Sequence, residues 1–255
     1  MNPIRRYEAI MEQLLISKEV TVAELSERMQ VTGKTIREDL AKLEDQGLLI
    51  RVHGGAVLAQ GDQLGILPVK EPNIKHRTEK AAIAERALRY IEPGDIIALD
   101  GGSTTLEIAK RLDNGRLTVV TNDVFIIGEL AKKPDIRLVV PGGYRVRNML
   151  VGPEAVSVIR GLNVQKAFLS TTGIHPEYGF SIYTGDLYDA KRAMIESAKV
   201  KVMVADSHKF GQIALRTFAA LSDVDAIVTD DGIDRELAER IRAAGGKIDC
   251  EAGTE

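Results

Sequence analysis

A short polar loop at residues 100–105 carries residue types that bind anions. It reads Asp-Gly-Gly-Ser-Thr-Thr and joins the apolar run 96–99, a predicted strand, to a predicted helix that continues to Leu112. Glycines let the backbone approach a ligand, and hydroxyls and free amides at a helix N-terminus bind a negative group with the help of the helix dipole. Phosphate is the natural ligand of such a loop. An ordinary strand-to-helix turn with a hydroxyl cap is the alternative, because it uses the same residue types.

Polar residues also end the next four apolar runs, at 117–121, 136–140, 166–170 and 200–205. They supply glycine backbone, hydroxyl, amide and lysine groups, and a helical segment near residue 191 adds a further cation. Together these groups suit a hydroxylated anion, which means a sugar phosphate. The candidate ligand-binding residues are Asp100, Gly102, Ser103, Thr104, Thr105, Thr121, Asn122, Gly142, Gly143, Lys191 and Lys209.

The apolar runs that carry these residues alternate with helical patterns from residue 75 onwards. Near-continuous apolar strands separated by helices are typical of a mostly parallel sheet covered on both faces, so the predicted fold is a doubly wound α/β domain. Ligands of such domains bind beyond the carboxyl ends of the strands. The polar residues lie at those ends, so we expect them to converge on one edge of the sheet.

The first 58 residues show another pattern, that of three helices followed by a hairpin. Apolar residues recur at helical spacing near the start of the chain, and Thr21 with Glu24 has the spacing of a capping box before a short second helix. A third helix opens at Thr32 or the residue after it and ends at Gly47, and a tight turn at 53–55 connects two short strands. This order is typical of a winged helix-turn-helix, which places one helix in the major groove of DNA.

The polar face of the third helix and the wing supply the candidate DNA contacts. Charge does not favour them, because residues 1–60 hold eight Lys/Arg and nine Asp/Glu, a net charge of −1 (8 − 9), in a chain of net charge −3. For His53, capping its own hairpin is as good an expectation as a contact to phosphate. The candidate DNA-binding residues are Thr32, Lys34, Thr35, Arg37, Glu38, Arg51 and His53.

The run from Thr35 to Ala56, TIREDLAKLEDQGLLIRVHGGA, resembles the signature of the DeoR family of transcriptional regulators. The family pattern is Thr-hydrophobic-Arg-Arg-Asp-Leu, then Leu-Glu-x-x-Gly, then Arg-x-His-Gly-Gly-Ala. One position departs, because Glu38 stands where the family usually has a second arginine. This exchange puts an anion at a DNA-facing position, where it could repel phosphate or accept a hydrogen bond from a cytosine amino group.

The resemblance continues beyond residue 75. The segments DGGSTT, TND, PGG, KRAMI and ADSHKFG look like the matching segments of the DeoR-family effector domain, which is similar in fold to ribose-5-phosphate isomerase. The resemblance implies a sugar-phosphate effector that alters operator affinity, most often as an inducer that relieves repression. His208 stands where the family more often has serine, so the resemblance does not identify the sugar.

Composition limits the other classes of function. No apolar run approaches the roughly 18 residues of a membrane span, and the single Cys250 excludes a disulfide framework and a cysteine-based zinc site. The four histidines are scattered with no pair at ligand spacing, which argues against a metal-responsive regulator. We therefore expect a cytoplasmic protein without a membrane partner, a metal or a cofactor.

The complete prediction is a two-domain regulator. A winged helix-turn-helix domain at 1–58 and a linker at 59–74 precede a sugar-phosphate-binding and oligomerisation domain at 75–255. We expect a repressor of a carbohydrate-utilisation operon that binds double-stranded operator DNA. A homodimer or homotetramer is expected, because dimerisation pairs two half-sites.

A phosphosugar isomerase is the alternative. In it Asp100, Asp206 or Asp230 would act as general base, and Lys191 would polarise the carbonyl group. The winged helix argues against this reading, because an isomerase has no use for a DNA-binding module. We therefore expect no enzymatic activity and no catalytic residue.

Overall fold

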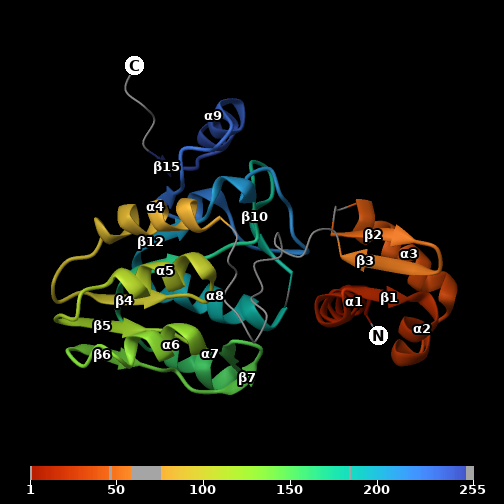
Figure 1. The fold of residues 1–255 in the computed structure, drawn as a ribbon, viewed down its shortest axis with the longest axis horizontal. Coiled ribbons are helices and arrows are strands. Elements are labelled where there is room, and N and C mark those ends of the chain that lie inside the picture. The colour runs from red at the N-terminus through yellow and green to blue at the C-terminus, as the bar shows by residue number, and fades with distance from the viewer. Residues whose placement is uncertain (1, 46–47, 59–75, 184, 251–255) are drawn as a thin grey trace.

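The computed structural model describes residues 2–45, 48–58, 76–183 and 185–250. In Figure 1 the described residues up to 58 form a small unit that lies beside a larger α/β unit. The linker expected at 59–74 falls outside the described residues. Within the residues that are described, no helix has both the length and the apolar character needed to cross a membrane.

The small unit consists of three helices and a three-stranded antiparallel sheet. Its elements are α1 (Pro3–Ser17), β1 (Glu19–Thr21), α2 (Val22–Met29), α3 (Gly33–Asp45), β2 (Leu49–Val52) and β3 (Gly55–Leu58). The expected capping box begins α2: the Glu24 amide donates to Thr21 Oγ1 (3.2 Å), and the Thr21 amide donates to Glu24 Oε2 (3.1 Å). The strand order is β1-β3-β2, so β1, which lies between α1 and α2, adds a third strand to the predicted hairpin.

An apolar stripe and one ion pair join α3 to the rest of the small unit. Ile36, Leu40 and Leu43 follow at helical spacing, and each is at most 1% exposed. Arg6 of α1 donates to Asp39 of α3 through Nε (2.7 Å) and through Nη2 (3.0 Å). Because this pair is bidentate and buried, it holds α1 and α3 in a defined relative position.

Seven parallel strands form the main sheet of the larger unit. They are β4 (Ile96–Leu99), β5 (Leu117–Val120), β6 (Ile136–Val139), β9 (Val164–Leu169), β12 (Ala198–Val204), β14 (Ala226–Val228) and β15 (Ile248–Asp249). Their order in the sheet is β15-β14-β12-β9-β4-β5-β6. The chain builds outward from β4 to β6 and then returns to add β9 on the other side of β4. The crevice between β4 and β9 is thus the topological switch point, where doubly wound domains bind ligands.

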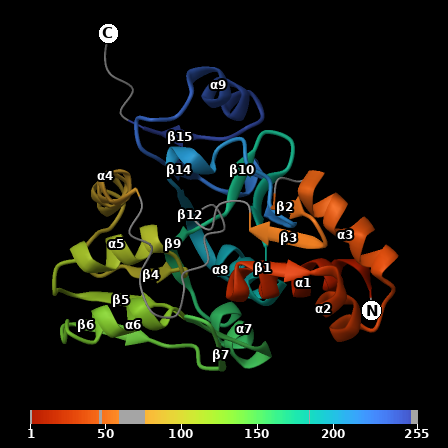
Figure 2. The same ribbon diagram turned by 45° about the vertical axis from the view of Figure 1, so that its right-hand side comes forward.

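Helices cover both faces of this sheet (Figures 1 and 2). One face packs against α4 (Arg77–Leu88), α5 (Ser103–Arg111) and α6 (Val124–Leu130), and the other against α7 (Pro153–Arg160), α8 (Gly185–Ser197) and α9 (Arg235–Ala243). Strand residues alternate between the two cores, with Ile97 and Leu99 in the first and Ala98 in the second. The predicted fold class, a helix-turn-helix unit joined to a doubly wound α/β unit, is confirmed.

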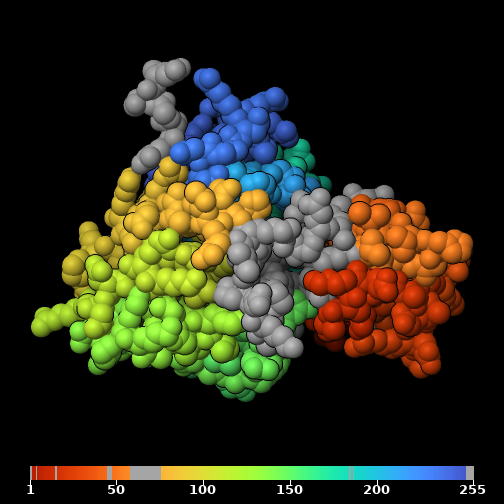
Figure 3. Space-filling view, in the orientation of Figure 1, coloured from red at the N-terminus to blue at the C-terminus, as the bar shows by residue number. Residues whose placement is uncertain are grey.

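Smaller β structures extend the larger unit in ways that the periodicity did not predict. They are the hairpin of β7 (Tyr144–Val146) and β8 (Met149–Val151), and the antiparallel sheet of β10 (Gly173–His175), β11 (Gly179–Ile182) and β13 (Arg216–Ala219). Both ribbon views place α8 and β10 on the side of the larger unit that faces the small unit. In the space-filling view the small unit occupies one end of the molecule (Figure 3).

Candidate functional site

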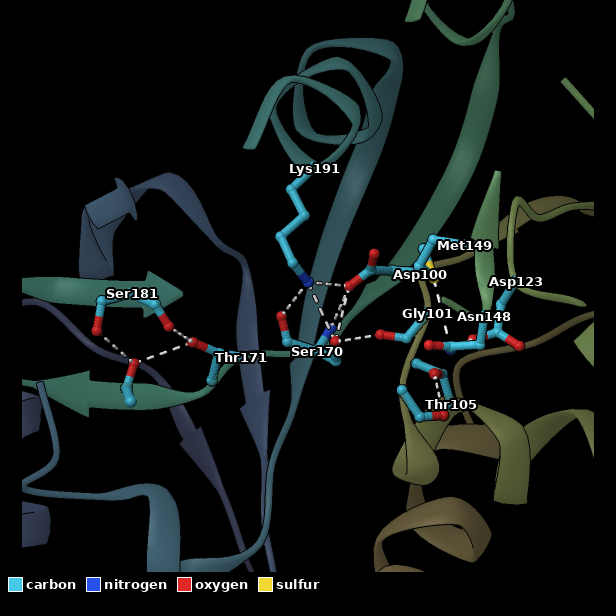
Figure 4. Close-up of polar contacts among 12 residues, drawn as sticks. Asp100, Gly101, Thr105, Asp123, Asn148, Met149, Ser170, Thr171, Ser181 and Lys191 are labelled. Atoms are coloured by element: carbon cyan, nitrogen blue, oxygen red, sulfur yellow. Dashed lines mark hydrogen bonds and ion pairs between the residues drawn. The ribbon is translucent and has the colours of Figure 1, made fainter. Parts of the chain in front are cut away.

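An ion pair lies at the switch point between β4 and β9. Leu99 of β4 pairs with Phe168 of β9, so the two strands end side by side and bring Asp100 next to Ser170. Lys191 of α8 reaches both residues: its Nζ donates to Asp100 Oδ2, to the Ser170 carbonyl (2.7 Å) and to Ser170 Oγ (3.1 Å). Figure 4 shows the lysine entering from its helix toward the two strand ends.

Burial makes this ion pair costly to break. Asp100 and Lys191 are each 2% exposed, and Asp100 Oδ2 also accepts from the amide and the hydroxyl of Ser170, both at 2.9 Å. A buried charge is tolerated only while it is paired and hydrogen-bonded. An anionic ligand that binds Lys191 must therefore compete with Asp100 for it.

The loop after β4 is shaped for close approach to a ligand. A Cβ on Gly102 would lie 2.8 Å from Ser170 Cβ, so a larger residue does not fit between α5 and β9. α5 begins at Ser103, which is half-buried, and the first amides of a helix have no partner within the helix. Thr104 is buried, and Thr105 Oγ1 donates to the Gly102 carbonyl (2.9 Å), which holds the first turn in shape. The loop can thus offer amides and the dipole of α5 to an anion.

The residues after β5 form a second polar group beside this loop. Thr121 Oγ1 accepts from the Asp123 amide (3.2 Å), and Asn122 Nδ2 donates to a backbone carbonyl of β8 (2.9 Å). Asp123 caps α6, because its Oδ1 accepts from two first-turn amides at 2.8 and 3.0 Å. Its Oδ2 accepts from Asn148 Nδ2 (2.5 Å), and burial raises the pKa of this carboxyl to about 6. Sequence reasoning placed Asp123 in the segment TND at this strand end but listed only Thr121 and Asn122 as candidate ligand-binding residues.

Three buried polar atoms among the described residues have no hydrogen-bond partner. They are Asn122 Oδ1, Asp206 Oδ1 and Thr229 Oγ1, and each residue follows the carboxyl end of a strand, β5, β12 or β14. The His208 ring nitrogen Nδ1 lies 3.5 Å from Asp206 Oδ1. Because an unmade buried hydrogen bond costs free energy, such atoms are natural partners for the hydroxyls of a bound ligand.

Lys80 belongs to this edge of the sheet, although the sequence reasoning did not single it out. It lies on α4 and is 3% exposed. Burial lowers the pKa of Lys80 and of half-buried Lys209, while the negative charge of Asp206 opposes both shifts. Asp206 therefore interacts with two ammonium groups at once, and an added anion would be attracted to them. Its spacing in the sequence could have identified Lys80 as a buried residue, because it falls three residues before Ile83 on the buried face of the same helix.

Gly142 and Gly143 lead from β6 into the β7–β8 hairpin. Both have positive φ values, 86° and 100°, which only glycine adopts without strain. A Cβ on Gly143 would collide with the Val151 carbonyl of β8. The hairpin geometry alone thus accounts for Gly143, and a ligand contact by either glycine stays a prediction.

The polar face of α3 is open to solvent, as a DNA-reading helix requires. The side chains of Lys34 and Glu38 are 85% and 62% exposed and lie 4.0 Å apart, and Arg37 is exposed beside them. Thr32 caps the helix, because its Oγ1 accepts from the Thr35 amide (3.2 Å). The structure therefore gives Thr32 a structural role in addition to the predicted one.

The wing is attached to α3 by Arg51. Its amide donates to Glu44 Oε1 (2.9 Å) and its Nε donates to Glu44 Oε2 (2.6 Å). These bonds lower the pKa of the Glu44 carboxyl. His53 is exposed in the turn, and its side chain makes no hydrogen bond to the described residues, so the expected cap of its own hairpin is not seen there. The exposed helix face and wing form one surface with mixed charge.

Two of the three carboxylates considered as general bases have structural partners. Asp100 is paired with Lys191, and Asp230 accepts from the amides of Ser207 (2.7 Å) and Gly232 (3.0 Å), which holds the loop after β14. In the described part of the chain, no three His, Cys, Asp or Glu side chains converge as a metal site would require. The arrangement suits the binding of a polar anion.

Comparison with known proteins divides the chain at the same place. Residues 6–61 match the DeoR-like helix-turn-helix domain and residues 75–231 match the DeoR C terminal sensor domain. The chain is 36% identical over 244 residues to the HTH-type transcriptional regulator YgbI of Escherichia coli (strain K12), covering 94% of this chain and 95% of that one. It is 36% identical over 250 residues to the transcriptional repressor AccR of Agrobacterium fabrum, covering 93% and 94%. Among solved structures, ribose 5-phosphate isomerase A from Methanocaldococcus jannaschii is similar at 16% identity and a TM-score of 0.38, over 51% of this chain and 52% of that one.

Proposed function

Because this chain belongs to the DeoR family of helix-turn-helix transcriptional regulators, we propose that a phosphorylated sugar or polyol controls its affinity for operator DNA. The chain is a regulator and not an enzyme. The observation that carries the proposal is the edge of the main sheet, where a helix N-terminus, buried lysines and buried polar atoms without partners occur together. Such a combination fits a ligand with one anionic group and several hydroxyls.

The charges at this edge favour a phosphate. Lys80 and Lys209 lie near Asp206, and Lys191 lies at the switch point, so three lysines contribute positive charge to this edge of the sheet. A phosphate carries about −1.5 to −2 charge at neutral pH and accepts several hydrogen bonds. The atoms Asn122 Oδ1, Asp206 Oδ1 and Thr229 Oγ1 would then receive the hydroxyls of the sugar.

The DNA-binding surface in this proposal is the exposed face of α3 together with the wing. Arg37 and Lys34 contact the operator, Arg51 and His53 steady the module from the wing, and Glu38 reads or rejects a base. We propose a repressor, in keeping with the name of the Agrobacterium relative. It would act in the cytoplasm as a homodimer or homotetramer, so that two modules reach two half-sites.

A thermal-shift screen of pentose, hexose and polyol phosphates tests the effector. At 100 times its dissociation constant, the true effector should stabilise the protein by about 2.7 kcal/mol, and the same sugar without phosphate should not. Lys80→Met should weaken binding of the effector about tenfold or more, as expected for loss of a hydrogen bond to a charged group. Lys110→Met, at an exposed lysine on α5, is the matched control and should bind normally.

A DNA-binding experiment with the same protein tests whether the effector controls operator affinity. Fragments of the source genome that the protein retains should include an operator, and the effector found in the screen should release it. Retention without any response to phosphorylated compounds would reject the effector proposal and leave the DNA-binding role intact. Chemical conversion of any of these phosphates by the protein would contradict its assignment as a regulator.

A further inference from the structure

Helix α8 makes contacts at two places, the switch point and the small unit. Lys191, near its middle, forms the ion pair with Asp100 at the switch point. Gly185, its first residue, lies next to α1 of the small unit, because a Cβ there would lie 2.4 Å from Glu8 Oε1, at the end of a flexible side chain. Six residues separate the two positions, a rise of about 9 Å along a helix. One rigid element therefore touches both the candidate effector site and the DNA-binding unit.

The segment just before α8 is embedded in the small unit. Tyr183 is 6% exposed and belongs to the same apolar cluster as Ile10 and Leu14 of α1. Ala214, which precedes β13, lies in that cluster too, and its amide donates to Ser181 Oγ (2.8 Å) in β11. The larger unit thus inserts two side chains into the core that supports the recognition helix.

A second connection between the candidate effector site and the small unit runs along the backbone that follows β9. Thr171 follows Ser170 directly, and its Oγ1 lies 2.9 Å from the Gly173 carbonyl and 3.1 Å from the Ser181 carbonyl (Figure 4). Ser181 is two residues before Tyr183. Ser170, one of the two partners of Lys191, is therefore connected within a few residues to the segment that enters the small unit.

Inside the small unit, a buried ion pair connects α1 to α3. Arg6 lies two residues from Glu8 on α1 and forms the bidentate buried pair with Asp39 of α3. Asp39 is in the same helix as the exposed Arg37 and Glu38. A displacement of α1 should therefore move the DNA-reading face, because close-packed elements shift as units.

We propose that α8 is the coupling element of this regulator. An anionic ligand that draws Lys191 away from Asp100 shifts α8, and the shift is transmitted through Gly185 and Tyr183 to α1 and through Arg6 and Asp39 to α3. The identity of the ligand rests on the proposed function, but the coupling path does not. Operator affinity then changes because the ligand favours one of two positions of α8 over the other.

Hydrogen–deuterium exchange of the ligand-free full chain tests this path. Replacing the ion pair by the uncharged pair Asp100→Asn with Lys191→Met should raise exchange several-fold in the amides of α1 as well as in α8. The double replacement leaves no unpaired buried charge, which keeps the protein folded. In a Tyr183→Ala background, the same double replacement should change α8 and leave α1 as it was before the replacement.

Two controls separate this path from general loosening. Tyr178→Ala removes a 52% exposed tyrosine that lies between β10 and β11, and the α1 response should survive it. Asn122→Ala alters the site after β5 but leaves the ion pair of Lys191 and Asp100 in place, and it should leave α1 unchanged. A change confined to the site and α8, an equal α1 response with and without Tyr183, or the same α1 response from Asn122→Ala would each overturn the proposal. Because no ligand is used, failure here is distinct from failure of the sugar-phosphate proposal.

Discussion

The candidate DNA-binding surface takes its residues from one run, 32–53, whereas the candidate effector site draws on the ends of several strands and on helices α4, α5 and α8. In the first, the side chains of Lys34 and Glu38 are mostly exposed. In the second, Asp100 and Lys191 are almost fully buried and depend on each other.

Because of this difference, substitutions on the exposed face of α3 should affect binding alone, whereas substitutions at the effector site should also affect stability. Exposed residues on α3 can change without disturbing the core, because surface substitutions usually alter stability by no more than about 0.5 kcal/mol. At the sheet edge each charge is part of the packing, so a change in the site is also a change in stability. Measurements that report both quantities should therefore distinguish the two regions.

The largest expected effect comes from removing Lys191. Lys191→Met leaves the Asp100 carboxylate buried without its cation, which should lower the free energy of unfolding by about 3–5 kcal/mol. Urea denaturation measures the loss. Adding Asp100→Asn should recover most of it, because no buried charge remains unpaired. Equal losses in the single and the double variant would contradict the account of the ion pair.

Asp123 should make stability depend on pH. Its pKa of about 6 in the folded protein lies above the ordinary 3.8, so the folded state holds the proton more tightly than the unfolded chain. The stability that the neutral carboxyl provides is therefore complete below pH 3.8 and is lost as the pH rises through 6. The loss is about 3 kcal/mol, at roughly 1.4 kcal/mol per pKa unit.

Asp123→Asn isolates this dependence. Asparagine also caps helices well but does not ionise, so the variant should gain on the wild type as the pH rises from about 4 to 7. Urea denaturation across that range measures the difference. Asp113→Asn, at an exposed aspartate, should show no such trend, and parallel curves for Asp123→Asn and the wild type would argue against a raised pKa.

At the DNA surface the effect should fall on binding alone. Arg37→Ala should reduce operator affinity by about 1–3 kcal/mol if the arginine reads a base, with a thermal midpoint close to that of the wild type. Fluorescence anisotropy at several salt concentrations distinguishes a base contact from a phosphate contact. Loss of a phosphate contact would reduce the dependence of the logarithm of affinity on the logarithm of salt concentration by about one. Lys42→Ala, exposed in the last turn of α3, is the control; an equal loss there would point to general charge attraction.

The smallest effect on stability should come from Glu38. Its pair with Lys34 spans 4.0 Å between two largely exposed side chains, and such surface pairs contribute about 0–1 kcal/mol. Glu38→Gln should thus leave stability nearly unchanged while altering the preference at one base position, as measured by selection from randomised DNA. An unchanged preference would mean that Glu38 does not face the bases.

The motifs with local causes were predictable from residue order. The capping box of Thr21 and Glu24 and the buried stripe of Ile36 and Leu40 depend on neighbours within a turn of helix, so their spacing predicts them. The doubly wound class was predictable for a similar reason, because each strand–helix repeat shows its own periodicity. The three-stranded sheet of β10, β11 and β13 was not, since its short strands lack an alternating pattern and are held by packing against α8.

The residue order of this chain thus determined its family, its fold class and which strand ends are polar, because these depend on interactions between close neighbours. Only the tertiary structure decided that Lys191 meets Asp100, 91 residues away, and that Arg6 meets Asp39 across 33 residues. It also decided that Lys80 is buried near Asp206. Such pairings depend on the order of strands in the sheet and on which helix covers which face. Those arrangements come from burying two apolar cores at once, and no local pattern records them.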